Sequence, residues 1–208
     1  SANWMDGVDE EIRRAEMAPS VQERDAQGRA FERPRMHFAN RGQALRAYFD
    51  EDGAEFGPRA EDGWRVRMRT VGLCRGETVV DESDPPIARI ERDCVVYEHA
   101  WGREWYANRA EGIEQGFEVR ERLEGTGPLR IELETEAPGV SVATTERVVF
   151  AREGRDALQY HKLVVSDAAG RSVAAHIERE GARLALVLDD AVAVYPLHVD
   201  PLLSSPSW

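Results

Sequence analysis

The 208-residue sequence predicts an all-β protein, built as one or more antiparallel β-sandwiches with a short N-terminal helix. Three observations lead to this fold class. Apolar and charged residues alternate along several runs, which is the period of a half-buried strand. In the second half, turn residues recur about every 8–12 residues, a spacing typical of an antiparallel sandwich or barrel. Strand-like runs do not alternate with long amphipathic helices, so a parallel βαβ sheet is not expected.

The first 34 residues predict a helix followed by a polar link. Residues 6–18 read DGVDEEIRRAEMA, with acidic residues first and arginines later. This order suits the helix dipole, and Pro19 ends the pattern. Its apolar stripe is thin, so we expect the helix to rest on a sheet edge rather than in a core.

Residues 35–126 predict a first β-subdomain. The turn sequence DEDG at 50–53 is flanked by apolar runs, which is typical of a hairpin. In residues 64–70, tryptophan, valine and methionine alternate with three arginines, so one face of this strand should meet water. We expect strands at 36–38, 44–49, 54–56, 64–70, 87–90, 94–99, 103–107 and 112–122, with the segment DESDPP at 81–86 as a loop.

Residues 127–208 predict a second β-subdomain. Leu129, Ile131 and Leu133 alternate with charged residues, and a meander of strands and turns follows. We expect its strands at 157–165, 172–178, 183–188 and 192–199. The boundary between the halves would fall near residues 125–128, although strands of both halves could also form one continuous domain.

Composition excludes some classes of partner. The net charge of −12 disfavours nucleic acid, because binding to a phosphate backbone requires a positive field. No run approaches the roughly 18 apolar residues that a membrane-spanning helix needs, so no membrane span is expected.

The two cysteines, Cys74 and Cys94, end one strand-like run and open the next. If these strands are neighbours, a disulfide would close a loop of about 20 residues and stabilise the fold by roughly 3 kcal/mol. Two unpaired, partly buried thiols are the alternative. Two cysteines without a nearby histidine pair do not predict a zinc site, and we expect no metal or other cofactor.

Acidic and aromatic residues gather near the centre of the chain. The candidates for ligand binding are Trp101, Trp105, Glu98, Glu104 and Glu114. Carboxylates beside aromatic rings suit a sugar-binding groove or a glycosidase. The alternative is that the acids are surface or hydrogen-bonding residues and the aromatics pack in the core, since 39 acidic residues meet often by chance. No nucleophile elbow and no glycine-rich phosphate loop occurs, so we predict no catalytic residue.

Four segments point to a family. They are WYANRAEGIEQGFEV at 105–119, DDAVAVYPLHVDPLL at 189–203, SSPSW at 204–208 and NRGQALRAYF at 40–49. Together they resemble the β-rich region that precedes FG-GAP (integrin-α-like) repeats in large extracellular proteins of myxobacteria and related deltaproteobacteria. The resemblance covers most of the chain from about residue 36, and YPLHVDPLL at 195–203 is its most specific part.

The resemblance implies a secreted or cell-surface module cut from the N-terminal side of a repeat array. The aspartate-rich calcium loops of such repeats do not occur here, and the family offers no catalytic residues to transfer. We therefore expect a non-enzymatic module with a structural, capping or adhesive role and a protein or cell-surface partner, which could be the repeats themselves. The alternative is a carbohydrate-binding or carbohydrate-cleaving domain that uses the stretch from Trp101 to Phe117.

Overall fold

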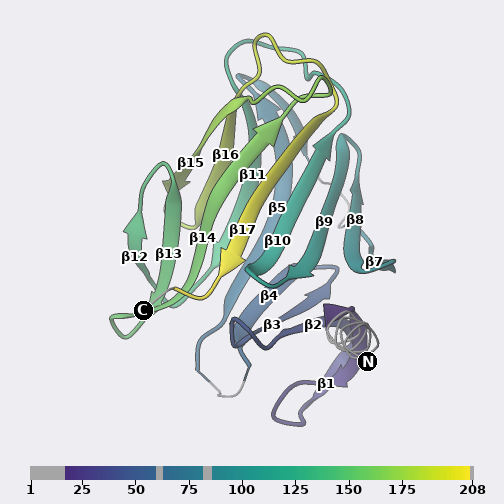
Figure 1. The fold of residues 1–208 in the computed structure, drawn as a ribbon, viewed down its shortest axis with the longest axis vertical. Helices are drawn as coiled ribbons and strands as arrows, with labels where there is room; N and C mark the ends of the chain where they lie inside the picture. The colour runs from purple at the N-terminus through teal and green to yellow at the C-terminus, as the bar shows by residue number, and fades with distance from the viewer. Residues whose placement is uncertain (1–16, 60–62, 82–85, 207–208) are drawn as a thin grey trace, which may run out of the picture.

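The computed structural model describes residues 17–59, 63–81 and 86–206 (Figure 1). The strands β1 to β17 form two antiparallel sheets that face each other, so the predicted all-β fold class is confirmed. The helix expected over residues 6–18 lies almost entirely outside the described residues, and the described part of the chain supports no such element.

The first sheet, called sheet A, contains nine strands. In spatial order they are β1 (Ser20–Arg24), β2 (Ala30–Asn40), β3 (Leu45–Asp50), β4 (Gly53–Pro58), β5 (Val66–Arg75), β11 (Leu129–Glu136), β16 (Arg183–Asp189) and β15 (Ala174–Glu180), and β6 (Thr78–Asp81) pairs with β5 beside β4.

The second sheet, called sheet B, contains eight strands. In spatial order they are β12 (Val140–Ala143), β13 (Arg147–Arg152), β14 (Arg155–Ser166), β17 (Leu197–Ser204), β10 (Gly112–Val119), β9 (Gly102–Arg109), β8 (Cys94–His99) and β7 (Ala88–Glu91). Both sheets take strands from residues 35–126 and from residues 127–208, so the two halves of the chain share one pair of sheets.

A single apolar core fills the space between the sheets, because alternate residues of each strand point inward. In β11, Leu129, Ile131 and Leu133 are fully buried while the charged residues between them stay partly exposed. Across the gap, the ring of Tyr106 lies 4.9 Å from Phe49 and 6.2 Å from Phe56, measured between centroids. These aromatic contacts pack sheet A against sheet B.

The structure differs from the sequence-based expectation at several edges. The strands β1, β6 and β12 were not predicted, because each has only four or five residues, which is too short for its pattern to stand out in the sequence. The strand expected over 192–199 begins only at Leu197, and the preceding residues form a turn in which Val192 is 83% exposed. This turn is held by an ion pair between buried Arg75 and Asp190, with Arg75 Nη1 2.9 Å from Asp190 Oδ1.

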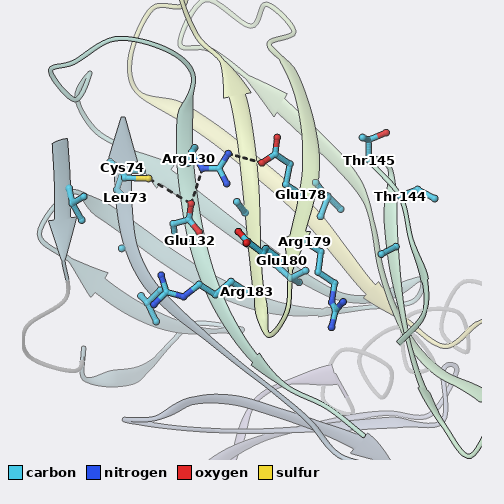
Figure 2. Close-up of a pocket in the computed structure, with 17 residues that line it drawn as sticks. Leu73, Cys74, Arg130, Glu132, Thr144, Thr145, Glu178, Arg179, Glu180 and Arg183 are labelled. Carbon is cyan, nitrogen blue, oxygen red and sulfur yellow. Dashed lines mark hydrogen bonds and ion pairs between the residues drawn. The ribbon is translucent and has the colours of Figure 1, made fainter. Parts of the chain in front are cut away.

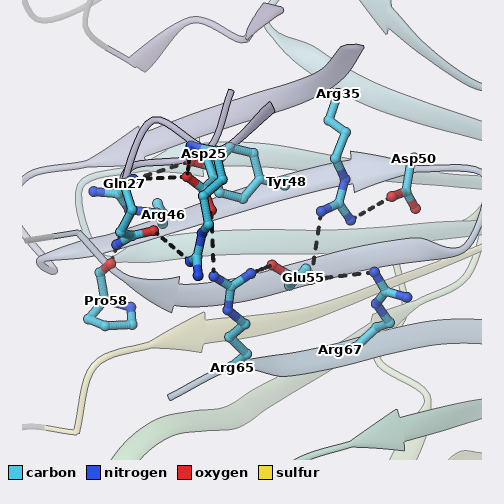
Figure 3. A network of polar contacts seen from close by, with 11 residues as sticks. Asp25, Gln27, Arg35, Arg46, Tyr48, Asp50, Glu55, Pro58, Arg65 and Arg67 are labelled. Carbon is cyan, nitrogen blue, oxygen red and sulfur yellow. Dashed lines mark hydrogen bonds and ion pairs between the residues drawn. The ribbon is translucent and has the colours of Figure 1, made fainter. Parts of the chain in front are cut away.

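The outer face of β2 to β5 carries a network of ion pairs (Figure 3). Glu55 accepts hydrogen bonds from Arg65 at 2.7 Å and Arg67 at 3.4 Å, and it also pairs with Arg35 at 3.6 Å. Arg35 reaches Asp50 at 2.5 Å. The arginine face expected for residues 64–70 is therefore confirmed, and its charge is offset by carboxylates within the same sheet.

Candidate functional site

The predicted site residues on the hairpin of β9 and β10 lie on two different sides of sheet B. Because side chains alternate along a strand, Glu104 and Gln115 point into the core while Trp105 and Glu114 point outward. The five ligand candidates therefore do not form one site.

The inward residues build a buried polar network. Glu104 is only 3% exposed, and its carboxylate accepts a hydrogen bond from Gln115 Nε2 at 2.7 Å and lies 3.0 Å from His99 Nε2. The hydroxyl of Tyr160 donates to Gln115 Oε1 at 2.7 Å, and Gln115 Nε2 lies 2.9 Å from the Tyr106 hydroxyl. This chain of contacts links β8, β9 and β10 on the inner side of sheet B and reaches past β17 to β14.

The protonation of Glu104 follows from these partners. Burial alone would raise the pKa of its carboxyl, but the hydrogen bond and charge of His99, together with the hydrogen bonds of Tyr106 and Gln115, outweigh that effect and leave the pKa lowered. Burial raises the pKa of Tyr106 and Tyr160 well above the ordinary tyrosine value. Glu104 is thus an ionised, fully partnered carboxylate, whereas a general acid needs a raised pKa and access to a substrate.

Trp101 belongs to the same interior cluster. It is 7% exposed and stacks on His99, with ring centroids 4.7 Å apart and an interplanar angle of 9°. Its second aromatic neighbour is Phe117, at 6.3 Å between centroids. Trp101 therefore covers the buried pair of Glu104 and His99, and it is a packing residue.

The remaining two acidic candidates lie on the outer face of sheet B. Glu98 binds both Arg89 and Arg120 at 2.7 Å, and although burial works in the opposite direction, these arginines lower its pKa. Glu114 lies 3.3 Å from Arg109. Both side chains are therefore charged surface groups that already have cationic partners.

Trp105 is the outward aromatic of the hairpin. It is partly exposed and lies opposite Gly116 of β10. Asp200 of β17 lies on the same outer face and was not among the predicted residues. Asp200 is close to Trp105 because β17 pairs with β10, and no local pattern in residues 105–119 could indicate that pairing.

A hollow lies elsewhere, on the outer face of sheet A (Figure 2). It measures about 960 Å³ and runs from Cys74 on β5 across β11 and β16 to the turn at Thr144 and Thr145. Within it, Arg130 donates to Glu132 at 2.8 Å and to Glu178 at 2.7 Å. Acidic and basic groups thus pair across its floor.

The predicted disulfide between Cys74 and Cys94 is wrong, because both cysteines are free. Cys74 lies in β5 of sheet A, whereas Cys94 opens β8 of sheet B, since the chain crosses between the sheets after β6. The Cys74 thiol lies 3.7 Å from Glu132 Oε1. Burial raises the pKa of both thiols, so each stays protonated at neutral pH.

Two further searches concern the described residues alone. Within residues 17–59, 63–81 and 86–206, no group of three or more histidine, cysteine, aspartate and glutamate side chains is arranged to hold a metal ion. In the same ranges, no helix has the length and apolar character to cross a membrane.

Comparison with protein-family models, with curated protein sequences and with solved structures finds no match for this chain.

Proposed function

We propose that the protein is a non-enzymatic extracellular β module that lies N-terminal to a repeat array and has a structural, capping or adhesive role. The observation that carries this proposal is the position of residues 195–203, the most specific part of the resemblance to regions that precede FG-GAP repeats. From Leu197 onward this segment forms β17, which lies in sheet B between β14 and β10 (Figure 1).

A strand in this position is a firm anchor for a neighbouring domain. β17 is hydrogen-bonded to β10 on one side and to β14 on the other, and Leu197, Val199 and Leu203 are fully buried. The backbone N–H of Ser205 then donates to Gln43 Oε1 at 3.1 Å. A segment that continued from this strand could not pull away without breaking two ladders and exposing apolar side chains.

The arrangement of carboxylates supports a role without catalysis. Retaining glycosidases hold two carboxyl groups about 5–5.5 Å apart on either side of one scissile bond. Here Glu104 is enclosed in the core, while Glu98 and Glu114 lie on the outer face and are paired with arginines. The candidates therefore offer no such pair.

The test uses the full-length protein in its source cells, with and without residues 1–208. If the module caps or presents the repeats, deletion lowers the soluble yield of the repeat region, and if it is adhesive, deletion lowers the fraction of cells that stay attached to a surface. Unchanged solubility together with unchanged attachment would contradict both roles.

An epitope tag tests the extracellular location separately. The turn between β13 and β14 is exposed at Glu153 and Gly154, and a Cβ built on Gly154 meets no atom within 4 Å, so a protease-cleavable tag can be inserted there. Protease added to intact cells should remove this tag. A tag that is cut only after lysis would place the module inside the cell and exclude the proposal.

Carbohydrate binding is the second candidate. The observation that favours it is Trp105, an outward-facing tryptophan on the outer face of sheet B. Trp101 and Glu104 do not contribute to such a surface, because both lie in the interior.

A further inference from the structure

The indole of Trp105 lies over the backbone of its neighbouring strand. A Cβ atom built on Gly116 would lie 2.1 Å from Cε2, 2.2 Å from Cζ2 and 2.5 Å from Nε1 of Trp105. Because Cε2 is bonded to the other two atoms and is the closest of the three, the Cβ position lies over the ring face rather than outside its edge. One face of the indole is thus turned to Gly116, and the other is turned away from the sheet.

The same row of sheet B continues with an acidic residue. The register pairs Glu114 with Leu202 and Phe117 with Val199, so Asp200 lies opposite Gly116. On its other side Asp200 pairs with Val164 of β14, which is 61% exposed. Directly paired residues point to the same face, so an indole, a carboxylate and an exposed valine follow one another across the outer surface.

Two further polar side chains, Glu114 and His198, lie near Asp200. Burial and the charge of Glu114 raise the pKa of the Asp200 carboxyl, and His198 opposes them. Glu114 and His198 therefore lie near Asp200, one on each side of the row along β10 and β17. The strip thus combines one aromatic face with hydrogen-bonding side chains.

This combination suits a neutral sugar. The C–H face of a pyranose ring packs on an aromatic face, while a carboxylate can accept hydrogen bonds from two hydroxyl groups. Negatively charged ligands are disfavoured by Asp200 and Glu114. Quaternary ammonium groups are recognised by cages of several aromatic rings, whereas this strip presents a single indole.

We infer that the outer face of sheet B binds an uncharged pyranoside unit of a polysaccharide, stacked on Trp105 and hydrogen-bonded to Asp200. The inference rests on the proposed adhesive role and names its ligand class. Glu114 and His198 flank the sugar, and Val164 contacts the next unit of the chain. A polysaccharide presents many such units, so a weak single contact is multiplied on a surface.

The test is native affinity electrophoresis of the 208-residue chain in gels that contain a soluble polysaccharide. The neutral probes are mannan, xylan, laminarin and dextran, and polygalacturonate is the anionic probe. We expect at least one neutral polymer to retard the protein, and we expect Trp105→Ala and Asp200→Ala each to weaken this retardation at least tenfold. The control Glu134→Gln, on the outer face of sheet A, should match the unchanged protein.

A further variant separates binding from folding. Val164→Arg places a long side chain on an exposed position, so it should keep the urea midpoint of the unchanged protein and still weaken retardation severalfold. The inference is overturned if no neutral polymer retards the protein, if Trp105→Ala binds as well as the unchanged protein, or if polygalacturonate is the only ligand. Cell attachment that depends on residues 1–208 but survives Trp105→Ala would overturn the sugar site and leave the adhesive module intact.

Discussion

The two faces of the β9–β10 hairpin use similar residue types for different purposes. On the inner face, Glu104 is bound by His99 and Gln115 and covered by Trp101. On the outer face, Trp105 lies over Gly116, and Asp200 lies opposite Gly116 on the next strand, β17. Glu104 and Trp105 are adjacent in sequence, yet Glu104 is buried among hydrogen-bonding partners and Trp105 is partly exposed on the surface.

The physical reason is the cost of removing polar groups from water. A carboxylate in the interior is stable only when charged or hydrogen-bonding partners replace its hydration. Those partners then occupy the positions that a substrate would need. On the outer face water supplies the missing hydrogen bonds, so the groups there can exchange water for a ligand.

The largest expected effect is the loss of the buried carboxylate. Glu104→Ala leaves the imidazole of His99 and the amide of Gln115 in the core without their shared acceptor, so we expect it to lower the free energy of unfolding by about 3–5 kcal/mol. Urea unfolding followed by circular dichroism measures this loss. The control is Glu118→Ala, an outer-face carboxylate on β10, which should change stability by less than about 0.5 kcal/mol. Equal effects of the two variants would contradict the inner–outer contrast.

The two tryptophans provide the next comparison. Trp101→Ala opens a cavity above His99 and should cost about 3–5 kcal/mol of stability, because Trp101 is almost fully buried. Trp105→Ala removes a side chain that is already partly exposed, so its cost should be clearly smaller. The same urea titration compares them, and the contrast is lost if Trp105→Ala proves the more damaging.

Gly116→Ala tests whether Trp105 is held against the strand. The added methyl group would meet the indole at 2.1 Å, so the ring must move away. We expect a loss of about 1–3 kcal/mol, together with a change in tryptophan fluorescence. Gly42→Ala is the control, because its Cβ would meet no atom closer than 3.7 Å. An unchanged fluorescence spectrum in Gly116→Ala would show that the indole does not rest there.

The smallest expected effect is a difference between Glu104 and Asp200 in how stability depends on pH. Folding lowers the pKa of Glu104, so the ionised carboxylate stabilises the folded protein. This stabilisation is present above the unfolded pKa of about 4.3 and disappears as the pH falls through the folded pKa. Folding raises the pKa of Asp200, so the protonated carboxyl is the form that the folded protein favours. Its stabilisation is present below the unfolded pKa of about 3.9 and is lost as the pH rises through the folded pKa.

Asp200→Asn should therefore have a slightly higher urea midpoint than the unchanged protein at pH 7, with the gain disappearing near pH 3. Glu104→Gln should show its greatest deficit at pH 7 and a smaller one in acid. Titrations at these two pH values measure both variants. A raised pKa of Asp200 is contradicted if Asp200→Asn is less stable than the unchanged protein at pH 7 and equal to it at pH 3.

Local patterns predicted much of the fold. The alternation at Leu129, Ile131 and Leu133 and the turn at residues 50–53 were both confirmed as parts of antiparallel strands and hairpins. Edge strands such as β1 were missed, because an edge with few buried residues leaves no periodic signal. The apolar residues Val192 and Val194 suggested a strand, but they lie in an exposed turn set by the ion pair of Arg75 with Asp190.

The candidate site was predicted only in part. Trp105 and Glu114 were both proposed from sequence, and both lie on the outer face of sheet B. Asp200 was missed because it lies 84 positions beyond its strand neighbour Gly116. The disulfide was wrong for a related reason, since closeness in sequence does not show that Cys74 and Cys94 lie in different sheets.

Strand formation is decided by short-range physics, because the side-chain period of two and the turn residues act over a few positions. The sequence therefore suffices for an all-β antiparallel fold and for the opposite facing of Glu104 and Trp105. Which strands become neighbours is decided by the packing of the whole core. That packing alone brings β17 beside β10, encloses Glu104 with Gln115 and Tyr160, and lays Trp105 beside Asp200 on the surface.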